Sequence, residues 1–421
     1  MPHASTGAAI AGFDEPVRRG EDQRRDRPVS LDSASSVRSR PPARPQSGGV
    51  SSAWVRSVDW LLVGSAVAMS VLGSLLIYSA TQGKLAHQGL DPQTFLKRHL
   101  VNLLIGLALA FLIQRFDYRL LRAYTPILYL ASIVGLVVVL SPIGKTINGS
   151  HAWILLPAGF SIEPAEFAKV AIILGMAMLL SEKHDSSTEP RDADVGLAIL
   201  VALVPMGLVL LQPNVGTMLM IVTPMLAVIA VAGVKGRWLV AILGAGGLAT
   251  YAVVQLHLIK TYQVQRFTAF VQPALNQQSF GYNTTQARIA IGSGGLFGKG
   301  LFHGPETQGR FVPENQTDFV FSVLGEELGF IGAITLVVLL GIFLWRAITI
   351  ATKAQDLFGR LVATGIACWI AFQAFENIGM NLGIMPVTGV PLPFVSYGGS
   401  SMFAAWIAVG LLLNVHMRSQ E

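Results

Sequence analysis

Long apolar runs, separated by short polar connections, dominate residues 59–415 of this chain. A helix needs about 20 residues to cross a hydrocarbon core of about 30 Å, and ten of the runs are long enough. Backbone N–H and C=O groups inside a bilayer must be bonded within the protein, so such runs fold as helices. The sequence therefore predicts an all-α polytopic membrane protein with about ten transmembrane helices, near 59–80, 98–115, 123–142, 163–181, 195–211, 215–233, 237–256, 318–346, 357–380 and 394–415.

The charge content agrees with a membrane protein, because 13% of residues are charged against about 25% in soluble domains. A formal net charge of +6 could indicate nucleic acid binding. The basic residues are instead spread over short loops and one tail, as topology signals are, so we expect no nucleic acid partner. The single cysteine, Cys368, excludes an internal disulfide and a cysteine metal cluster.

Basic residues also predict the orientation of the chain. Residues 1–52 form an Arg-, Ser- and Pro-rich tail that cannot bury enough apolar surface to fold, so we expect it to be disordered. Its arginines precede the first apolar run and place it in the cytoplasm. Residues 53–421 then form one multi-pass membrane domain, with both termini cytoplasmic. The loop between helices 7 and 8, residues 257–317, is expected outside the cell.

That outer loop has about 60 residues, and a connection of this length is usually functional. We expect a short helix at 283–291 on the membrane surface, followed by a Gly-rich turn. The loop ends in a polar segment that enters an apolar run at Asp318. A carboxylate at the mouth of a membrane helix is costly to desolvate and indicates a purpose or a partner. The alternative is that Asp318, with Thr317, caps the helix.

Several segments resemble one known family: GLFGKG (295–300), TDFVFSVLGEELGF (317–330) and GVPLPFVSYGGSS (389–401). They are similar to the SEDS family of shape, elongation, division and sporulation proteins, of the RodA/FtsW/SpoVE type. The resemblance covers about residues 55–415 and implies a polytopic peptidoglycan glycosyltransferase that polymerises lipid II into glycan strands. It also implies a location in the plasma membrane of a bacterium. It also implies that Asp318 is catalytic. The sequence of residues 389–401 is more similar to the RodA branch, which acts in cell elongation and shape maintenance.

Polymerising a lipid-linked sugar needs a base for the acceptor hydroxyl, and we assign that role to Asp318. It also needs positive charge for the departing lipid pyrophosphate. The predicted pyrophosphate-binding residues are Lys299, Arg310, Arg288 and Arg98, with backbone N–H groups of the Gly-rich stretch 292–300. The alternative is that each cation lies among lipid headgroups. A divalent cation, Mg²⁺ or Mn²⁺, could bridge pyrophosphate to a carboxylate. GSGGLFGKG lacks the ending of a Walker loop, so no nucleotide is expected.

Three further segments supply candidates. Glu166 and Lys169 are three residues apart on one helix face and could form a structural ion pair or couple to substrate. Trp153 could stack on a sugar or anchor the membrane interface. In LQPNVGT the family often has Asp where this chain has Asn214, so we assign Asn214 neither metal binding nor proton transfer. The Pro- and Gly-rich segment 376–402 predicts a re-entrant or packed outer segment near Asp318, with Ser396, Tyr397 and Ser400 facing the substrate.

The resemblance further implies partners: lipid II, an undecaprenyl-linked glycan strand, membrane lipids and a class B penicillin-binding transpeptidase. A lipid II flippase is the rival function, but its polar residues would line a pathway across the membrane. Here the polar motifs cluster at the outer ends of the helices, which favours the enzyme. A purely structural scaffold would leave the loop carboxylate and cations without a role.

Overall fold

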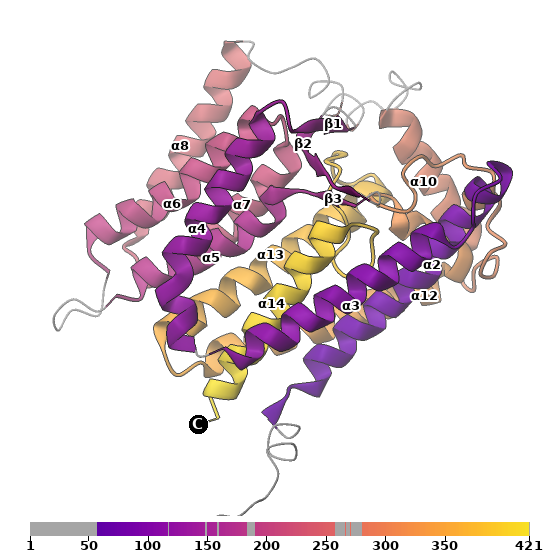
Figure 1. The fold of residues 1–421 in the computed structure, drawn as a ribbon. Coiled ribbons are helices and arrows are strands. Elements are labelled where there is room, and N and C mark those ends of the chain that lie inside the picture. Colours follow the sequence, from indigo (N-terminus) through magenta and orange to yellow (C-terminus); the bar gives the residue numbers. More distant parts are fainter. Residues whose placement is uncertain are drawn as a thin grey trace, which may run out of the picture. The chain divides into compact units, whose positions relative to one another are not determined.

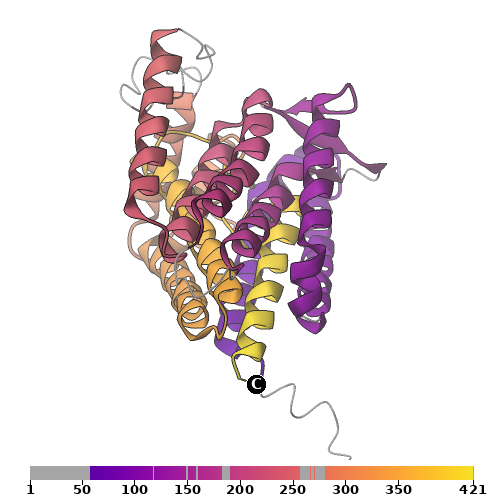
Figure 2. The same ribbon diagram turned by 90° about the vertical axis from the view of Figure 1, so that its left-hand side faces the viewer.

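The structure is a computed structural model that describes residues 57–116, 118–147, 150–157, 160–182, 190–256, 266, 270 and 280–420. The predicted tail 1–52 and nearly all of 257–279 lie outside these ranges. Long helices occupy the ten predicted positions (Figures 1 and 2). They are α2 (Trp60–His87), α3 (Thr94–Arg115), α4 (Tyr118–Leu140), α5 (Pro164–Leu180), α6 (Asp192–Leu211), α7 (Val215–Val231), α8 (Gly236–Gln255), α12 (Val320–Lys353), α13 (Leu357–Leu382) and α14 (Gly399–Arg418).

Eight of these helices are long and apolar enough to cross a membrane, and α7 is a shorter apolar helix of 17 residues. The polytopic helical fold is thus confirmed, whereas the side on which each end lies stays a prediction. Helix α5 lies at the centre of the packing, against α4, α6, α7, α13 and α14. Its sequence explains this position, because almost every residue is small or apolar and most are buried. Only Glu166 and Lys169 carry charge along its length.

Helix α12 is broken near its start, at Gly329, whose φ of 64° is left-handed. Segment 295–300 lies in the break and replaces the missing helical hydrogen bonds with backbone bonds of its own. A β-carbon at Gly298 would lie 2.1 Å from a carbonyl oxygen of α12, so only glycine fits this approach. The four bonds are Lys299 N to Glu326 O (2.9 Å), Gly300 N to Glu327 O (3.0 Å), Phe330 N to Gly295 O (2.9 Å) and Ile331 N to Leu296 O (3.1 Å).

The expected helix at 283–291 is present but longer, as α10 (Phe280–Gly294), and it packs against α12 and α13. The short helix α11 (Pro305–Gln308) follows the Gly-rich segment. The buried Glu326 carboxylate holds α11 by accepting hydrogen bonds from the backbone N–H groups of Glu306 and Thr307, at 2.7 and 2.9 Å. The loop between α10 and α12 is thereby fixed on the helices rather than extended.

Three short strands form an antiparallel sheet of order β1-β2-β3 between α4 and α5: β1 (Lys145–Ile147), β2 (Ser150–Leu155) and β3 (Ser161–Ile162). We call this three-stranded sheet the hairpin. Figures 1 and 2 show it at the end of the helices opposite the C-terminus. Two hydrogen bonds attach it to the turn between α6 and α7. His151 N and Ser150 Oγ both donate to the carbonyl oxygen of Gln212, at 3.2 and 3.1 Å.

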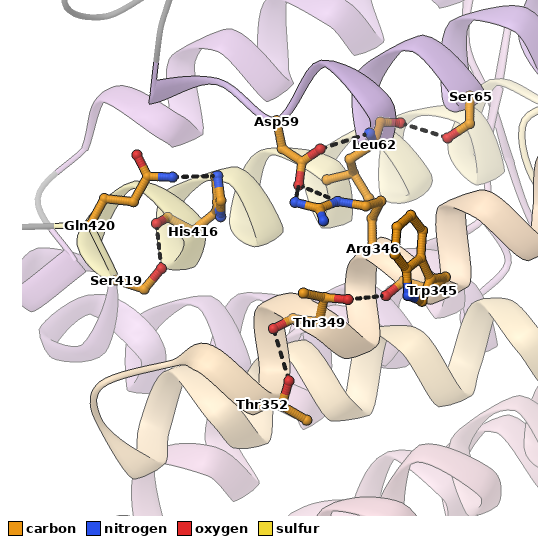
Figure 3. A network of polar contacts seen from close by, with 10 residues as sticks. All are labelled: Asp59, Leu62, Ser65, Trp345, Arg346, Thr349, Thr352, His416, Ser419 and Gln420. Carbon is orange, nitrogen blue, oxygen red and sulfur yellow. Dashed lines mark hydrogen bonds and ion pairs between the residues drawn. The ribbon is translucent and has the colours of Figure 1, made fainter.

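A polar network lies at the other end, near the C-terminus (Figure 3). Asp59, at the N-cap of α2, accepts a hydrogen bond from Leu62 N at 3.1 Å. Its other oxygen pairs with Arg346 of α12, with Nε 2.8 Å away. The Asp59 and Arg346 side chains are 2% and 19% exposed. His416 of α14 is drawn beside this ion pair, so three helices meet at it.

Removing one partner of this ion pair is expected to destabilise the fold. Asp59→Asn keeps an oxygen for the Leu62 N–H but leaves the Arg346 charge without its counterion. Breaking a buried pair in this way costs about 3–5 kcal/mol. We expect a clearly lower midpoint of thermal unfolding in detergent, and recovery of most of the loss in the double variant Asp59→Asn/Arg346→Met. An unchanged midpoint in Asp59→Asn would show that the pair adds nothing.

Candidate active site

A cavity of about 630 Å³ opens at the hairpin end of the helices. Its walls come from α3, the hairpin, the turn before α7, the loop before α12 and the loop before α14. Three of its residues carry a carboxylate and one carries a guanidinium. The polar and aromatic side chains in the lining are Phe95, Asn102, Ser150, Trp153, Phe160, Ser161, Glu163, Asn214, Arg266, Glu314, Gln316, Thr317, Asp318, Thr388, Tyr397, Ser400, Ser401 and Phe403.

Asp318 lies in this wall, two residues before α12. The N-cap position of α12 is Phe319, so the alternative that Asp318 caps the helix is wrong. Two amide side chains of α13 hold its backbone instead. Asn377 and Asn381 donate from Nδ2 to the Asp318 carbonyl oxygen, at 2.9 and 3.1 Å. These two contacts hold the backbone of Asp318 and do not use its carboxylate oxygens.

The surroundings of Asp318 favour its neutral form. Burial, then the Glu314 carboxylate, raise its pKa to about 7, while Arg266 and a hydrogen bond from Thr317 act in the opposite direction. Arg266 is itself held by a bond from Nη1 to the carbonyl oxygen of Thr388, at 2.9 Å. A carboxyl group with a pKa close to neutrality can both accept and release a proton under physiological conditions.

The loop after α13 forms the wall facing Asp318. The sequence predicted a packed segment near Asp318 in this part of the chain. Gly389 has φ +76°, and a β-carbon built on it would lie 3.4 Å from Oδ2 of Asp318. Ser396 joins this loop to the one before α12: its Oγ accepts from Leu392 N at 2.8 Å and donates to Thr317 O at 2.6 Å. Both partners of this hydroxyl are backbone groups, and Ser396 is not among the residues that line the cavity.

Tyr397, Trp153 and Ser400 do line the cavity, so these three predicted residues lie together with Asp318. The Tyr397 ring packs edge-to-face on Phe95, with centroids 5.0 Å apart. Ser400 Oγ accepts a hydrogen bond from the backbone N–H of Glu163, at 2.9 Å. This bond ties the start of α14 to the start of α5. Whether these side chains contact substrate stays a prediction.

The predicted cations are dispersed. None of the four, Lys299, Arg310, Arg288 and Arg98, is among the described residues that line the cavity. Lys299 is exposed beside the break in α12, Arg310 donates to Gly83 O of α2 at 2.9 Å, and Arg288 lies against Gly383 at the end of α13. Arg98 lies beside Tyr397, where its charge opposes the burial that raises the tyrosine pKa. The backbone N–H groups of 299 and 300 are already bonded to α12.

The ion pair expected between Glu166 and Lys169 is present, with Nζ 2.9 Å from Oε1. Lys169 also donates to Gln373 Oε1 of α13 at 3.2 Å and lies 4.7 Å from the ring centroid of Trp369. Gln373 in turn donates to Pro391 O at 2.8 Å. The pair therefore joins α5, α13 and the loop that forms the cavity wall, while a coupling role stays a prediction.

Three charged residues of the cavity were not among the predicted site residues: Glu163, Glu314 and Arg266. Glu163 Oε1 accepts a hydrogen bond from Asn214 Nδ2 at 2.9 Å. Glu163 directly precedes a proline that begins an apolar run. A charged residue at the start of a membrane helix could have indicated a functional site. Arg266 lies in a long loop whose sequence gives no indication of where it folds back.

A divalent cation was predicted, and the described residues test how well the protein could hold one. In the part of the chain that the structure describes, no three His, Cys, Asp or Glu side chains gather closely enough to bind a metal ion. These described residues therefore do not form a ready set of ligands for a metal ion, and binding of a divalent cation stays a prediction.

Comparisons with known proteins agree with the fold. A family model, the FtsW/RodA/SpoVE cell cycle proteins, matches residues 59–421. The chain is 38% identical to a probable peptidoglycan glycosyltransferase FtsW of Trichlorobacter lovleyi, covering 85% of this chain and 92% of that protein. It is 40% identical to the stage V sporulation protein E of Bacillus subtilis, covering 86% and 98%.

Two solved structures are similar as well. One is described as the structural coordination of polymerization and crosslinking by a peptidoglycan synthase complex; it has a TM-score of 0.71 and 33% identity, over 86% of this chain and 99% of the other. The second is the rod shape determining protein RodA of Thermus thermophilus, with a TM-score of 0.63 and 33% identity, covering 86% and 98%. Since FtsW, SpoVE and RodA proteins all match, the branch predicted from 389–401 is not distinguished.

Proposed function

Because the chain belongs to the FtsW/RodA/SpoVE family, we propose that it is a peptidoglycan glycosyltransferase that polymerises lipid II at the outer leaflet of a bacterial plasma membrane. The observation that carries this proposal is the cavity that presents Asp318 beside Trp153 and Tyr397. Such a pocket combines a titratable carboxylate with aromatic rings that can stack on sugars. It lies at one end of the apolar helices, where a lipid-linked sugar reaches the protein from the bilayer surface.

In the proposed reaction Asp318 is the general base. The acceptor sugar hydroxyl attacks the anomeric carbon of the lipid-linked sugar, and its proton passes to an Asp318 carboxylate oxygen. The bond from the anomeric carbon to the pyrophosphate oxygen breaks, and its electron pair leaves with the lipid pyrophosphate. One carboxylate is sufficient because this leaving group needs little acid assistance. A positioned base contributes about 10²–10⁴-fold to such a step.

Positive charge at the leaving group is assigned differently from the sequence prediction. Arg266 lines the cavity and lies near Asp318, so we infer that it contacts the pyrophosphate. An arginine fork can bind two phosphate oxygens at once, which suits this role. Arg98, beside Tyr397, is the second candidate. For Lys299, Arg310 and Arg288, contact with the pyrophosphate stays a prediction, and a position among lipid headgroups is the alternative.

The partner proposed for this chain is a class B penicillin-binding transpeptidase. The similar peptidoglycan synthase complex, whose description joins polymerization with crosslinking, supports this pairing. A role in cell elongation also stays a proposal, based on the amino-acid sequence of residues 389–401. Relatives of the division and sporulation type have identities of 38% and 40%, so elongation and division need a genetic test.

The experiment that tests the function uses the purified chain with its transpeptidase and labelled lipid II in detergent. We expect glycan polymer on a gel from the wild-type chain. A second arm reconstitutes the chain in vesicles and measures transfer of lipid II between leaflets. Polymer without transfer supports the enzyme, whereas transfer without polymer would instead support the flippase.

Polymerisation should depend on pH through Asp318. The active form of a general base is the carboxylate, and a pKa of about 7 means that this form is lost as pH falls through 7. An ordinary aspartate would keep it down to about pH 4. We expect the initial polymerisation rate to rise between pH 6 and 8, measured with the same lipid II concentration. A rate that stays constant down to pH 5 would contradict this assignment.

A further inference from the structure

Glu163 is a buried carboxyl group of the cavity that the proposed reaction does not use. It lies between β3 and α5, is 8% exposed, and is held at two points. Its backbone N–H donates to Ser400, and its Oε1 accepts from Asn214 Nδ2. Among the described residues no donor or acceptor contacts Oε2. Glu163 therefore has a fixed side chain with one oxygen available to the cavity that it lines.

Asn214 explains why the side chain has this orientation. The Asn214 Oδ1 atom caps α7 by accepting from Thr217 N at 3.2 Å, so its Nδ2 must point the other way, toward Glu163. The amide cannot flip without losing the cap. Whatever side chain occupies position 163 consequently receives a donor from Asn214 and must present an oxygen to it.

The strand register brings Trp153 to the same place. In the β2–β3 pair, Ile154 lies opposite Ile162. Continuing this antiparallel register by one residue sets Trp153 opposite Glu163, and directly opposed side chains extend from the same face about 5 Å apart. Both residues line the cavity. An aromatic ring beside a polar group is a common arrangement for binding a sugar, whose ring stacks while a hydroxyl or amide is hydrogen-bonded.

We propose that Glu163 and Trp153 form a sugar subsite in which the neutral Glu163 carboxyl donates a hydrogen bond from Oε2 to an oxygen of the sugar stacked on Trp153. This inference deepens the proposed function and rests on it for the identity of the sugar. The geometry fixes which oxygen carries the proton of the neutral carboxyl, because Oε1 is already the acceptor for Asn214. The hydroxyl of a neutral carboxyl then lies on the cavity side.

The charges around Glu163 support the neutral form. Burial, then the Glu166 carboxylate, raise its pKa to about 8, and Asp318 acts in the same direction. Lys169 and the Asn214 hydrogen bond oppose this, but Lys169 is already paired with Glu166. Arg266 and Glu314 line the same cavity. Burial and Glu166, rather than Asp318, are the main causes, so the neutral form of Glu163 is also expected in an Asp318→Asn chain.

The test measures equilibrium binding of labelled lipid II to the full-length chain in an Asp318→Asn background, where turnover does not interfere. Glu163→Gln keeps an oxygen for Asn214 and places an amide N–H on the cavity side, so it should bind within about threefold of the parent at pH 7. Glu163→Met has a similar volume and no donor, so its Kd should rise about tenfold or more. Glu182→Met, exposed just beyond the end of α5, is the matched control.

The pH dependence separates binding from a merely structural role. With Glu163 present, the Kd should rise with increasing pH as the donor proton is lost, whereas with Glu163→Gln it should stay constant. Equal Kd values for Glu163→Met and the parent, or equal losses in the Gln and Met variants, would overturn the inference. Absence of lipid II binding by the unmodified chain would instead overturn the proposed function.

Discussion

Asp318→Asn is expected to lower the rate of lipid II polymerisation by about 10²–10⁴-fold, because the variant keeps the shape of the site but cannot accept the acceptor proton. The backbone of residue 318 is held by Asn377 and Asn381 through its carbonyl oxygen, so the substitution leaves these bonds intact. The measurement is the initial rate of glycan polymer formation with the transpeptidase present. Asp91→Asn, at an exposed carboxylate, is the matched control.

Stability supplies an independent check on this variant. The pKa of Asp318 is raised in the folded protein, so the folded state binds a proton more tightly than the unfolded state between about pH 4 and 7. Stability is therefore lost as pH rises through that window, and removing the charge should raise the unfolding midpoint at pH 7. An inactive but stabilised variant would be the signature of a catalytic carboxylate. An active Asp318→Asn chain would contradict the assignment.

Lys169→Met should have the largest effect on stability. Lys169 is 1% exposed, and its loss leaves the Glu166 carboxylate buried without its counterion and Gln373 Oε1 with fewer donors. Removing one partner of a buried ion pair costs about 3–5 kcal/mol. We expect strongly reduced yield of folded protein and a much lower unfolding midpoint, measured in detergent by intrinsic tryptophan fluorescence.

The double variant Glu166→Gln/Lys169→Met distinguishes the two interpretations of this pair. It removes both charges, so most of the lost stability should return. If the pair is purely structural, polymerisation should return with it. If the pair couples to substrate, the folded double variant should remain inactive. A Lys169→Met chain as stable as wild type would contradict the structural argument.

The helices could be predicted from sequence because their signal is local: an apolar run long enough to cross a bilayer folds as a helix wherever it lies. The convergence of Trp153, Tyr397, Ser400 and Asp318 followed from motif resemblance, and these four residues do share one cavity. The cations could not be placed this way. Lys299 and Arg310 are in the predicted loop, but that loop folds onto α2 and into the break of α12.

The break in α12 explains why the positions of these cations could not be predicted. Nothing in GEELGF (325–330) distinguishes a broken helix from a continuous one, since a single glycine is common in membrane helices. Backbone N–H groups of the Gly-rich segment were predicted to bind pyrophosphate because a sequence does not show which of these groups are already hydrogen-bonded. Those of residues 299 and 300 are used by α12. Glu163 was missed because its neighbours Glu166 and Lys169 offered the more familiar pattern.

The break in α12 has a consequence for how the chain enters the membrane. Two carbonyl and two N–H groups of an apolar segment are bonded to residues 295–300 rather than within the helix. Left unbonded in hydrocarbon, each would cost several kcal/mol. Ribosomes deliver 295–300 before α12, so the filling segment is available when the helix is inserted. Residues 295–300 therefore precede α12 both in the chain and during assembly of the fold. A circular permutant with its new termini between these two elements would disrupt that order.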